Sequence, residues 1–224
     1  MSVRRVCGRR ARCRYPNSAN AFKALVAAEL GGVAGEIEVP AFNMGVDNRT
    51  PSFLRLNPHG KVPTLELEDG TGVFESNAIA RYVARVSTKG ALLGASPRTY
   101  ACVEQWLDFA QNEVQAPLAS WLYPLLGFRP YDKAREDKAK AQLKKALLVL
   151  EKVLAGTPFL AGEGLTLADV VLCCGSLPGW LKLFDAEYRA DLPKLTAYVQ
   201  RCYAMPEFAK HVGNVQLCDK ALTK

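Results

Sequence analysis

Residues 60–79 read GKVPTLELEDGTGVFESNAI, and their pattern is that of a strand, a turn, a second strand and a helix start. Two apolar runs flank the turn sequence Glu68-Asp69-Gly70, which is typical of a β-hairpin. Pro63 opens the first run, where it removes one backbone donor and where an X-Pro bond can be cis at modest cost. A plain strand start explains Pro63 equally well. Ser76 follows the second run and is a candidate N-cap for a helix.

The residues before this hairpin begin with a strand pattern and then a helix pattern. Ala11, Cys13 and Tyr15 alternate with arginines, and this period of two predicts a strand. Pro16-Asn17-Ser18 has the chemistry of a helix start, and Gly31-Gly32 is expected to end that helix.

Between this helix and the hairpin the sequence predicts two further elements. Ile37 and Val39 indicate a second strand, and Thr50-Pro51 opens a short helix that stops at Asn57-Pro58. The expected order of the N-terminal part is therefore βαβ–α–ββα.

A linker and a helical region follow. Residues 87–97 read STKGALLGASP, which is the composition of a linker. Beyond them every apolar stripe has helical spacing; the first is expected to end at Pro117, and Thr166-x-x-Asp169 has capping-box form. We therefore expect an N-terminal domain over residues 1–86, with a basic arm at 1–10, and an all-helical domain over 98–224.

Composition limits the class of protein. The chain has 224 residues, and its hydrophobic content of 49% excludes a disordered chain. The formal net charge is +7, but six arginines fall within residues 1–14 with no acid among them, which leaves +1 for the rest. The basicity thus belongs to an arm. A nucleic-acid partner is disfavoured because aromatic residues other than Tyr15 do not interleave these arginines.

Cysteine usage and hydropathy indicate the compartment. Seven cysteines without any C-x-x-C pair, together with two histidines, argue against a disulfide framework and against a metal site. The most apolar stretch, 165–181, is broken by Asp169 and Pro178, so no membrane span is expected. Because the N-terminus has no apolar signal segment, the expected location is the cytoplasm.

Two helix starts carry the candidate chemistry. A hydroxyl at Ser18 could stabilise a bound thiolate, because thiol pKa values fall at helix N-termini, or it could be a simple N-cap. Ser76 at the start of the later helix could bind an anion, and Glu75 beside it could bind an ammonium group. A ligand with both groups, such as the γ-glutamyl end of a peptide, would suit this pair; a plain N-cap is the alternative.

Taken together in this order, the motifs resemble the glutathione transferase fold. The second half agrees, since residues 159–169 (FLAGEGLTLAD) and 194–212 are similar to that family's folding-motif segment and to its late helix. The resemblance covers residue 11 to the end. It implies a thioredoxin-like α/β N-terminal domain followed by an all-α C-terminal domain, in a fold that commonly forms homodimers.

A narrower resemblance lies in residues 48–55 (NRTPSFLR) and 73–83 (VFESNAIARYV). These are similar to the glutathione transferase-like domain of the elongation factor 1-gamma family. The resemblance implies a scaffold that anchors the guanine-nucleotide-exchange subunit (alpha or beta) of the elongation factor 1 complex; the alternative is an active glutathione transferase. That family's full-length protein continues into a Lys-rich linker and another domain, so we expect a fragment or a designed chain.

The wider family implies a glutathione site, with glutathione as ligand or cosubstrate and no other cofactor. There the Val62-Pro63 bond would be cis and the Val62 backbone would pair with the cysteine of glutathione. Glu75 and Ser76 would hold its γ-glutamyl end, and Arg49 and Lys61 would meet its glycyl carboxylate. Ser18 would be the catalytic hydroxyl, with Tyr15 as a second candidate.

The first strand departs from the family pattern. Arg10, Arg12 and Arg14 would share one face of a strand that should lie inside the sheet. Because burying unpaired charge is costly, these side chains must reach solvent, pair with acids, or belong to an altered strand. The position of Ser18 depends on which of these holds.

Overall fold

A computed structural model describes residues 11–14, 18–89 and 92–224. The chain divides into two compact units, Met1–Leu93 and Gly94–Lys224, and the division falls within the stretch 87–97 expected to be a linker. The expected basic arm and Tyr15 lie outside the described residues.

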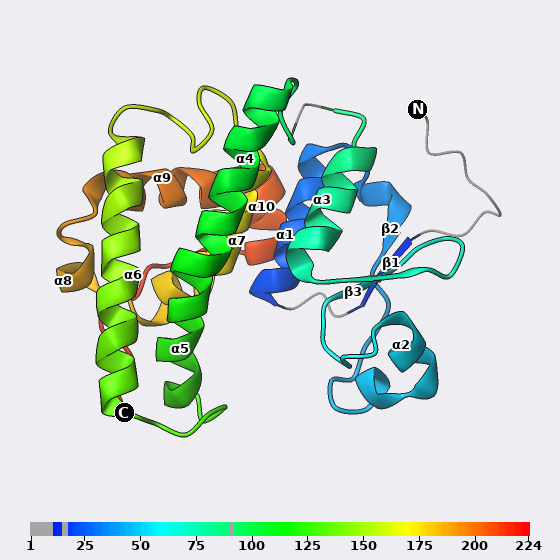
Figure 1. Ribbon diagram of the computed structural model, residues 1–224, viewed down its shortest axis with the longest axis horizontal. Helices are drawn as coiled ribbons and strands as arrows, with labels where there is room; N and C mark the ends of the chain where they lie inside the picture. The colour runs from blue at the N-terminus through cyan, green and yellow to red at the C-terminus, as the bar shows by residue number, and fades with distance from the viewer. Residues whose placement is uncertain (1–10, 15–17, 90–91) are drawn as a thin grey trace. The chain divides into compact units, whose positions relative to one another are not determined.

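The N-terminal unit is built on a four-stranded mixed sheet in the order β2-β1-β3-β4 (Figure 1). The central strand β1 runs parallel to β2 and antiparallel to β3, which pairs antiparallel with β4. Their bounds are β1 Ala11–Arg14, β2 Ile37–Glu38, β3 Thr64–Glu66 and β4 Gly72–Phe74. The predicted second strand is present, but it ends at Glu38, one residue before Val39, because only Ile37 and Glu38 pair with β1.

Three helices of this unit were expected from their caps. Ser18 accepts a hydrogen bond from the Ala21 N–H before α1, and Thr50 accepts one from the Phe53 N–H before α2. In the core of the unit α1 packs against α3. The helical bounds are α1 Ala19–Leu30, η1 Ala34–Glu36, η2 Asp47–Arg49, α2 Pro51–Leu56 and α3 Ser76–Val86.

The register of the sheet explains the arginines of β1. Cys13 pairs with Leu65, and both are fully buried on one face. Arg12 lies on the other face, where it pairs with Glu66 of β3 and Glu38 of β2. Its Nε donates to a Glu38 carboxylate oxygen at 3.0 Å, and both side chains remain about half exposed. Pairing with an acid is thus how Arg12 is accommodated, and β1 is regular over its described residues.

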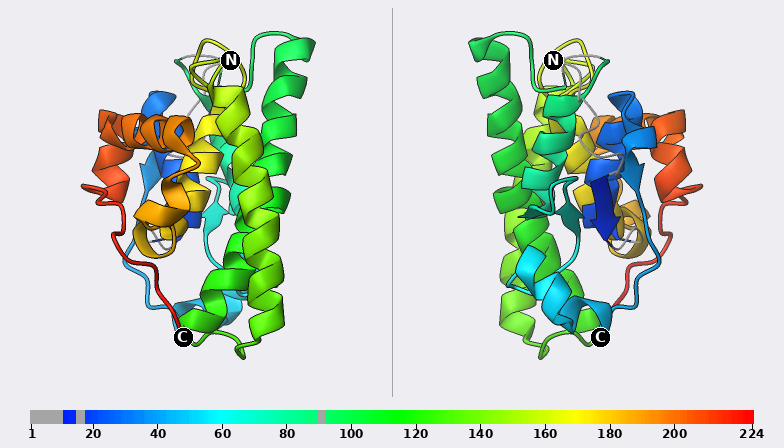
Figure 2. Two further views of the ribbon diagram at one scale, coloured as in Figure 1. Left: turned by 90° about the vertical axis from the view of Figure 1, so that its left-hand side faces the viewer. Right: turned by 90° about the vertical axis from the view of Figure 1, so that its right-hand side faces the viewer.

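The C-terminal unit is helical, and in it α5 and α6 run side by side (Figures 1 and 2). The prediction that the first helix ends at Pro117 was wrong. A π-helical segment joins α4 to α5, and Pro117 lies in the first turn of α5, where a missing N–H costs little. The bounds are α4 Pro97–Phe109, η3 Ala110–Gln115, α5 Ala116–Leu125, α6 Lys133–Leu154, α7 Leu167–Lys182, α8 Ala186–Arg189, α9 Pro193–Ala204 and α10 Pro206–Val212.

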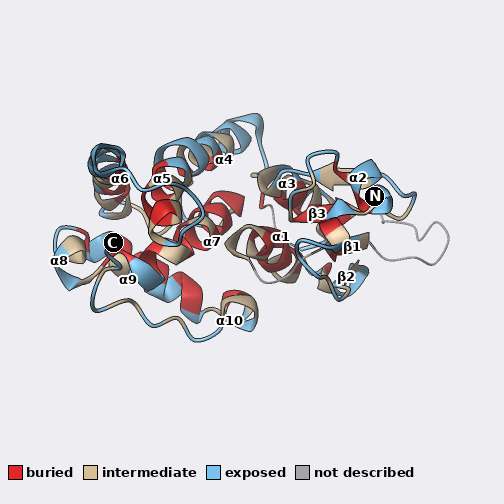
Figure 3. Ribbon diagram, turned by 90° about the horizontal axis from the view of Figure 1, so that it is seen from below, coloured by how far each residue is buried: buried red, intermediate tan, exposed pale blue. Residues whose placement is uncertain are grey.

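Helix α7 forms the core of this unit and is buried along most of its length (Figure 3). The predicted capping box is confirmed, because the Asp169 carboxylate accepts the Thr166 N–H at 2.8 Å. The same carboxylate is fully buried and also accepts the Leu160 N–H at 2.9 Å and the Tyr198 hydroxyl at 2.7 Å. Over residues 11–14, 18–89 and 92–224, no helix has the length and apolarity needed to cross a bilayer.

Candidate functional site

The first candidate, Ser18, is placed by the start of α1. Its backbone is extended, and its Oγ accepts the Ala21 N–H at 3.1 Å, so it is a helix N-cap. Within the described part of the chain the hydroxyl hydrogen of Ser18 has no acceptor. Since a serine hydroxyl can accept and donate at once, Ser18 can cap α1 and still donate to a ligand. Tyr15, the second candidate, lies outside the described residues.

The Val62–Pro63 peptide bond is cis, as the family resemblance implied. Pro63 is buried, and the preceding carbonyl of Lys61 accepts from Asn57 Nδ2 at 2.7 Å and from Thr64 Oγ1 at 3.0 Å. Neither the N–H nor the C=O of Val62 hydrogen-bonds to another described residue. Among the described residues nothing occupies these two groups of Val62, which the backbone of a peptide ligand could pair with.

Glu75 and Ser76 are placed differently from the prediction. Glu75, not Ser76, is the N-cap of α3, and its side chain makes no cap hydrogen bond; the expected N-cap role of Ser76 was wrong. Glu75 has a φ of 69°, a conformation that costs a non-glycine residue on the order of 1–3 kcal/mol and that is concentrated at functional sites. Because Ser76 is the first helical residue, its hydroxyl is not used for capping.

A buried lysine supports this helix start and was missed from the sequence. Lys23 of α1 is fully buried, and its Nζ donates to Ser76 Oγ at 3.1 Å and to Asn77 Oδ1 at 3.0 Å. An ammonium group has only donors, so Ser76 must accept from it, and its own hydrogen points elsewhere. The Ser76 hydroxyl donates to Asn20 Oδ1 at a long 3.4 Å. The available signal was a charged residue on the apolar face of the first predicted helix.

The two expected cations lie on neighbouring loops of the same unit. Arg49 ends η2, Lys61 precedes the cis bond, and both are exposed. Asn48 joins the loops, because its buried amide accepts the Gly45 N–H at 2.7 Å and donates to the Gly60 carbonyl at 2.8 Å. Within the described part of the chain neither cation has an acidic partner.

This arrangement suits a short peptide with anionic ends. The α3 N-terminus and Ser76 offer donors to a carboxylate, Glu75 offers a carboxylate to an ammonium group, and Val62 offers backbone pairing. Cys13 carries the thiol of strand β1. It is not a nucleophile at neutral pH, because burial raises its pKa to about 11. Across the described ranges, no three His, Cys, Asp or Glu side chains are grouped to hold a metal ion.

Comparison with known proteins accounts for both units. Residues 17–86 match the family described as glutathione S-transferase, N-terminal domain, and residues 114–206 match its C-terminal domain. The structure of a glutathione S-transferase from Xanthobacter autotrophicus is 32% identical, with a TM-score of 0.72, over 88% of this chain and 94% of that one. The chain belongs to the glutathione S-transferase family. The fold class predicted from the sequence is confirmed.

The narrower resemblance within the glutathione S-transferase family is confirmed as well. Elongation factor 1-gamma 1 of rice (Oryza sativa) is 43% identical over 205 residues, which are 92% of this chain and 49% of the rice protein. Human elongation factor 1-gamma is 38% identical over 92% of this chain and 47% of its own length. The chain therefore spans about half the length of the curated relatives it matches. The GST-like domain of yeast elongation factor 1-gamma, 23% identical, has the same fold with a TM-score of 0.82.

Proposed function

We propose that this glutathione S-transferase-fold chain is an assembly domain of the translation elongation factor 1 complex and anchors its guanine-nucleotide-exchange subunit. The observation that carries the proposal is the identity of 38–45% to proteins named elongation factor 1-gamma, over about nine-tenths of the chain, in plants and mammals. Identity at this level extends through both units and is higher than that to the solved transferases of the family.

The experiment is a binding measurement between the purified chain and a recombinant exchange subunit. We expect the two to co-elute in size-exclusion chromatography and to give a measurable heat of binding. The Xanthobacter transferase, which shares the fold, is the matched control and should not bind. Failure of the chain to bind, or equal binding by the control, would refute the proposal.

A second candidate function is conjugation of glutathione to electrophiles. It is favoured by the Ser18 hydroxyl hydrogen and by the Val62 backbone groups, for which residues 11–14, 18–89 and 92–224 supply no partner. In this reaction the thiol of glutathione loses its proton to water, and the thiolate is stabilised by the Ser18 hydroxyl and the start of α1. Its sulfur then forms a bond to the ring carbon of an aryl halide as the carbon–halogen bond breaks and halide leaves.

Turnover of glutathione with an aryl halide, followed by absorbance, tests this function. If the function holds, Ser18→Ala abolishes turnover while leaving the fold intact. A wild-type chain without turnover would eliminate the conjugating activity and leave the assembly function in place.

A further inference from the structure

One face of helix α6 carries two interleaved seven-residue repeats that are not used in the packing of its unit. Small or apolar residues recur at Ala134, Ala141 and Leu148, and lysines recur at Lys138, Lys145 and Lys152. All six are exposed, whereas the residues that face the core, such as Leu143, Leu147 and Leu150, are buried. Seven residues are about two turns, so each set forms a straight row with a spacing of about 10 Å.

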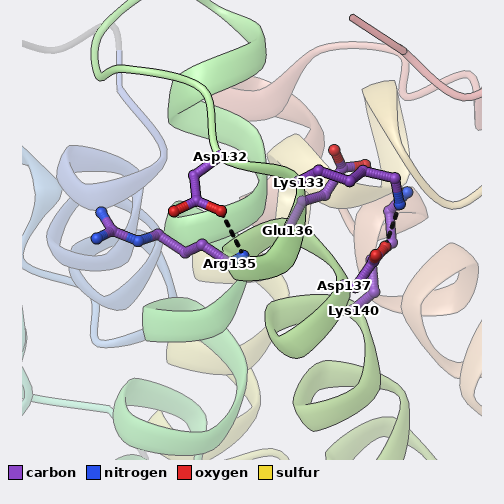
Figure 4. A network of polar contacts seen from close by, with 6 residues as sticks. All are labelled: Asp132, Lys133, Arg135, Glu136, Asp137 and Lys140. Carbon is purple, nitrogen blue, oxygen red and sulfur yellow. Dashed lines mark hydrogen bonds and ion pairs between the residues drawn. The ribbon is translucent and has the colours of Figure 1, made fainter.

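Two other lysines in the first half of α6 are paired with acids within the helix (Figure 4). Lys133 pairs with Asp137, Lys140 pairs with Glu136, and Asp132 accepts the Arg135 N–H at 3.1 Å. Further along, Lys144 pairs with Asp191 at 3.0 Å. In contrast, Lys138, Lys145 and Lys152 have no acidic partner anywhere in the described ranges. Positive charge on this face is thus uncompensated over four turns.

Apolar surface and a groove accompany the lysines. Leu148 and its neighbour Val149 are 37% and 39% exposed. An open groove of about 530 Å³ lies between α5 and α6, bordered by Ser120, Ala134, Lys138 and Gln142. A coiled-coil seam has apolar residues at two positions of each heptad; on this face Ala134, Ala141 and Leu148 supply one of them, and lysines stand beside it.

We propose that this face of α6, defined by the six repeat residues, is the docking surface for one acidic amphipathic helix of a partner protein. Asp or Glu residues at seven-residue spacing on that helix would meet the lysine row, while its apolar residues would cover Leu148 and Val149. This docking surface rests on the proposed function, because it says where on the assembly domain a partner protein binds. Nucleic acid is a poorer occupant, because the repeat has no aromatic residue to stack on bases and half of it is apolar.

The test uses the full chain and a synthetic helical peptide of about three heptads with leucine along one stripe and glutamate beside it. A second peptide has every glutamate replaced by lysine. Binding is measured by fluorescence anisotropy for wild type, for the row variant K138E/K145E/K152E, and for the control K182E/K194E/K220E. The control lysines are exposed, their side chains have no acidic partner among the described residues, and they lie outside α6; both variants change the net charge equally.

We expect the acidic peptide to bind wild type and the control variant within twofold of each other, and the row variant at least tenfold more weakly. Binding should also weaken with added salt, because exposed charges are screened. Equal binding of the two peptides, or equal affinity of the row and control variants, overturns the proposal. A fluorescent RNA oligonucleotide gives a further test. If wild type binds the RNA more tightly than the acidic peptide, and the row variant no longer binds the RNA, the proposal is overturned.

The exchange subunit separates this inference from the proposed function. If the subunit binds the row variant as tightly as wild type, the docking surface is refuted and the assembly function stands. If it binds none of the chains while the acidic peptide still requires the lysine row, the assembly function is refuted and the docking surface stands. Circular dichroism of all three chains confirms that the variants remain folded.

Discussion

Replacing Asp169 by asparagine removes the acceptor around which the C-terminal unit is organised. One carboxylate oxygen accepts the Leu160 N–H at 2.9 Å and the Tyr198 hydroxyl at 2.7 Å. The other accepts the Thr166 N–H at 2.8 Å and the Thr166 hydroxyl at 3.0 Å. Asparagine has nearly the same volume, but only one of its two terminal atoms can accept.

The magnitude follows from counting the donors that lose their acceptor. If the amide oxygen faces Leu160 and Tyr198, the amide nitrogen faces the two donors of Thr166. The hydroxyl can rotate and accept, but the partly buried Thr166 N–H is left without its acceptor, which costs about 1–3 kcal/mol. The retained bonds also weaken, since bonds to a charged acceptor are stronger than bonds to a neutral one.

An opposing effect limits the loss. Burial disfavours the charged carboxylate and raises the pKa of Asp169, and the neutral amide avoids that penalty. We therefore expect Asp169→Asn to lower the free energy of unfolding by about 3 kcal/mol, which corresponds to a fall in Tm of about 9 °C for a chain of this size.

Urea unfolding measures the free energy of unfolding, and calorimetry measures Tm. The matched control is Asp191→Asn, because the Asp191 side chain is 67% exposed and, within the described part of the chain, pairs with Lys144 alone. Its loss should stay within about 0.5 kcal/mol. A loss below about 1 kcal/mol for Asp169→Asn, or one equal to that of the control, would show that the buried hydrogen bonds do not carry this stability.

Three further outcomes are expected. Glu75→Gly should raise the free energy of unfolding by about 1 kcal/mol, because glycine adopts a φ of 69° without strain, whereas Glu75→Ala should give no gain in the same urea titration. Ser18→Ala should lower the free energy of unfolding by about 1 kcal/mol, because the N-cap of α1 is lost. Ser18→Asp, which can cap the helix but has no hydroxyl, should restore this stability without restoring any turnover of glutathione. Burial raises the pKa of Cys13 from 9.0 to about 11, so the unfolded chain loses this proton first as pH rises. The free energy of unfolding should therefore fall between pH 9 and 11. In Cys13→Ala this fall should be smaller than in wild type by up to about 3 kcal/mol. If wild type and Cys13→Ala have the same pH profile of stability, the burial of this thiol is contradicted.

Features that depend on residues a few positions apart were predictable. The turn at Glu68–Gly70, the caps at Ser18 and Thr50, and the Thr166–Asp169 capping box are all present in the structure. Each one satisfies backbone groups with side chains no more than a few residues away, so the pattern and its cause lie in the same short segment.

Two local predictions failed for a related reason. Pro117 was expected to end a helix, yet a proline in the first turn of a following helix is compatible with continued helical structure. Ser76 was expected to be an N-cap, but the backbone turns one residue earlier, at Glu75. In both places the residue type allows two neighbouring positions, and packing of the surrounding chain selects between them.

In the candidate site, patterns of neighbouring residues predict where single residues stand along the chain but not which distant residues contact them. Sequence patterns alone placed Ser18, Val62, Glu75 and Ser76 at the starts of the right elements, because capping and strand entry restrict which residues can stand there. Only the folded sheet and helices bring the Lys23 ammonium, 53 positions away in the chain, onto the Ser76 hydroxyl.

The two charged faces follow the same division. The spacing of the charged residues can be read from the sequence, because strand geometry puts alternate residues of β1 on one face and helix geometry puts every seventh residue of α6 on one face. Whether each face is buried, paired or exposed depends on which neighbours the chain places beside it. Tertiary structure brings Glu38 to Arg12 and leaves Lys138, Lys145 and Lys152 without an acid among the described residues, because ion pairing requires contact across segments that no local pattern encodes.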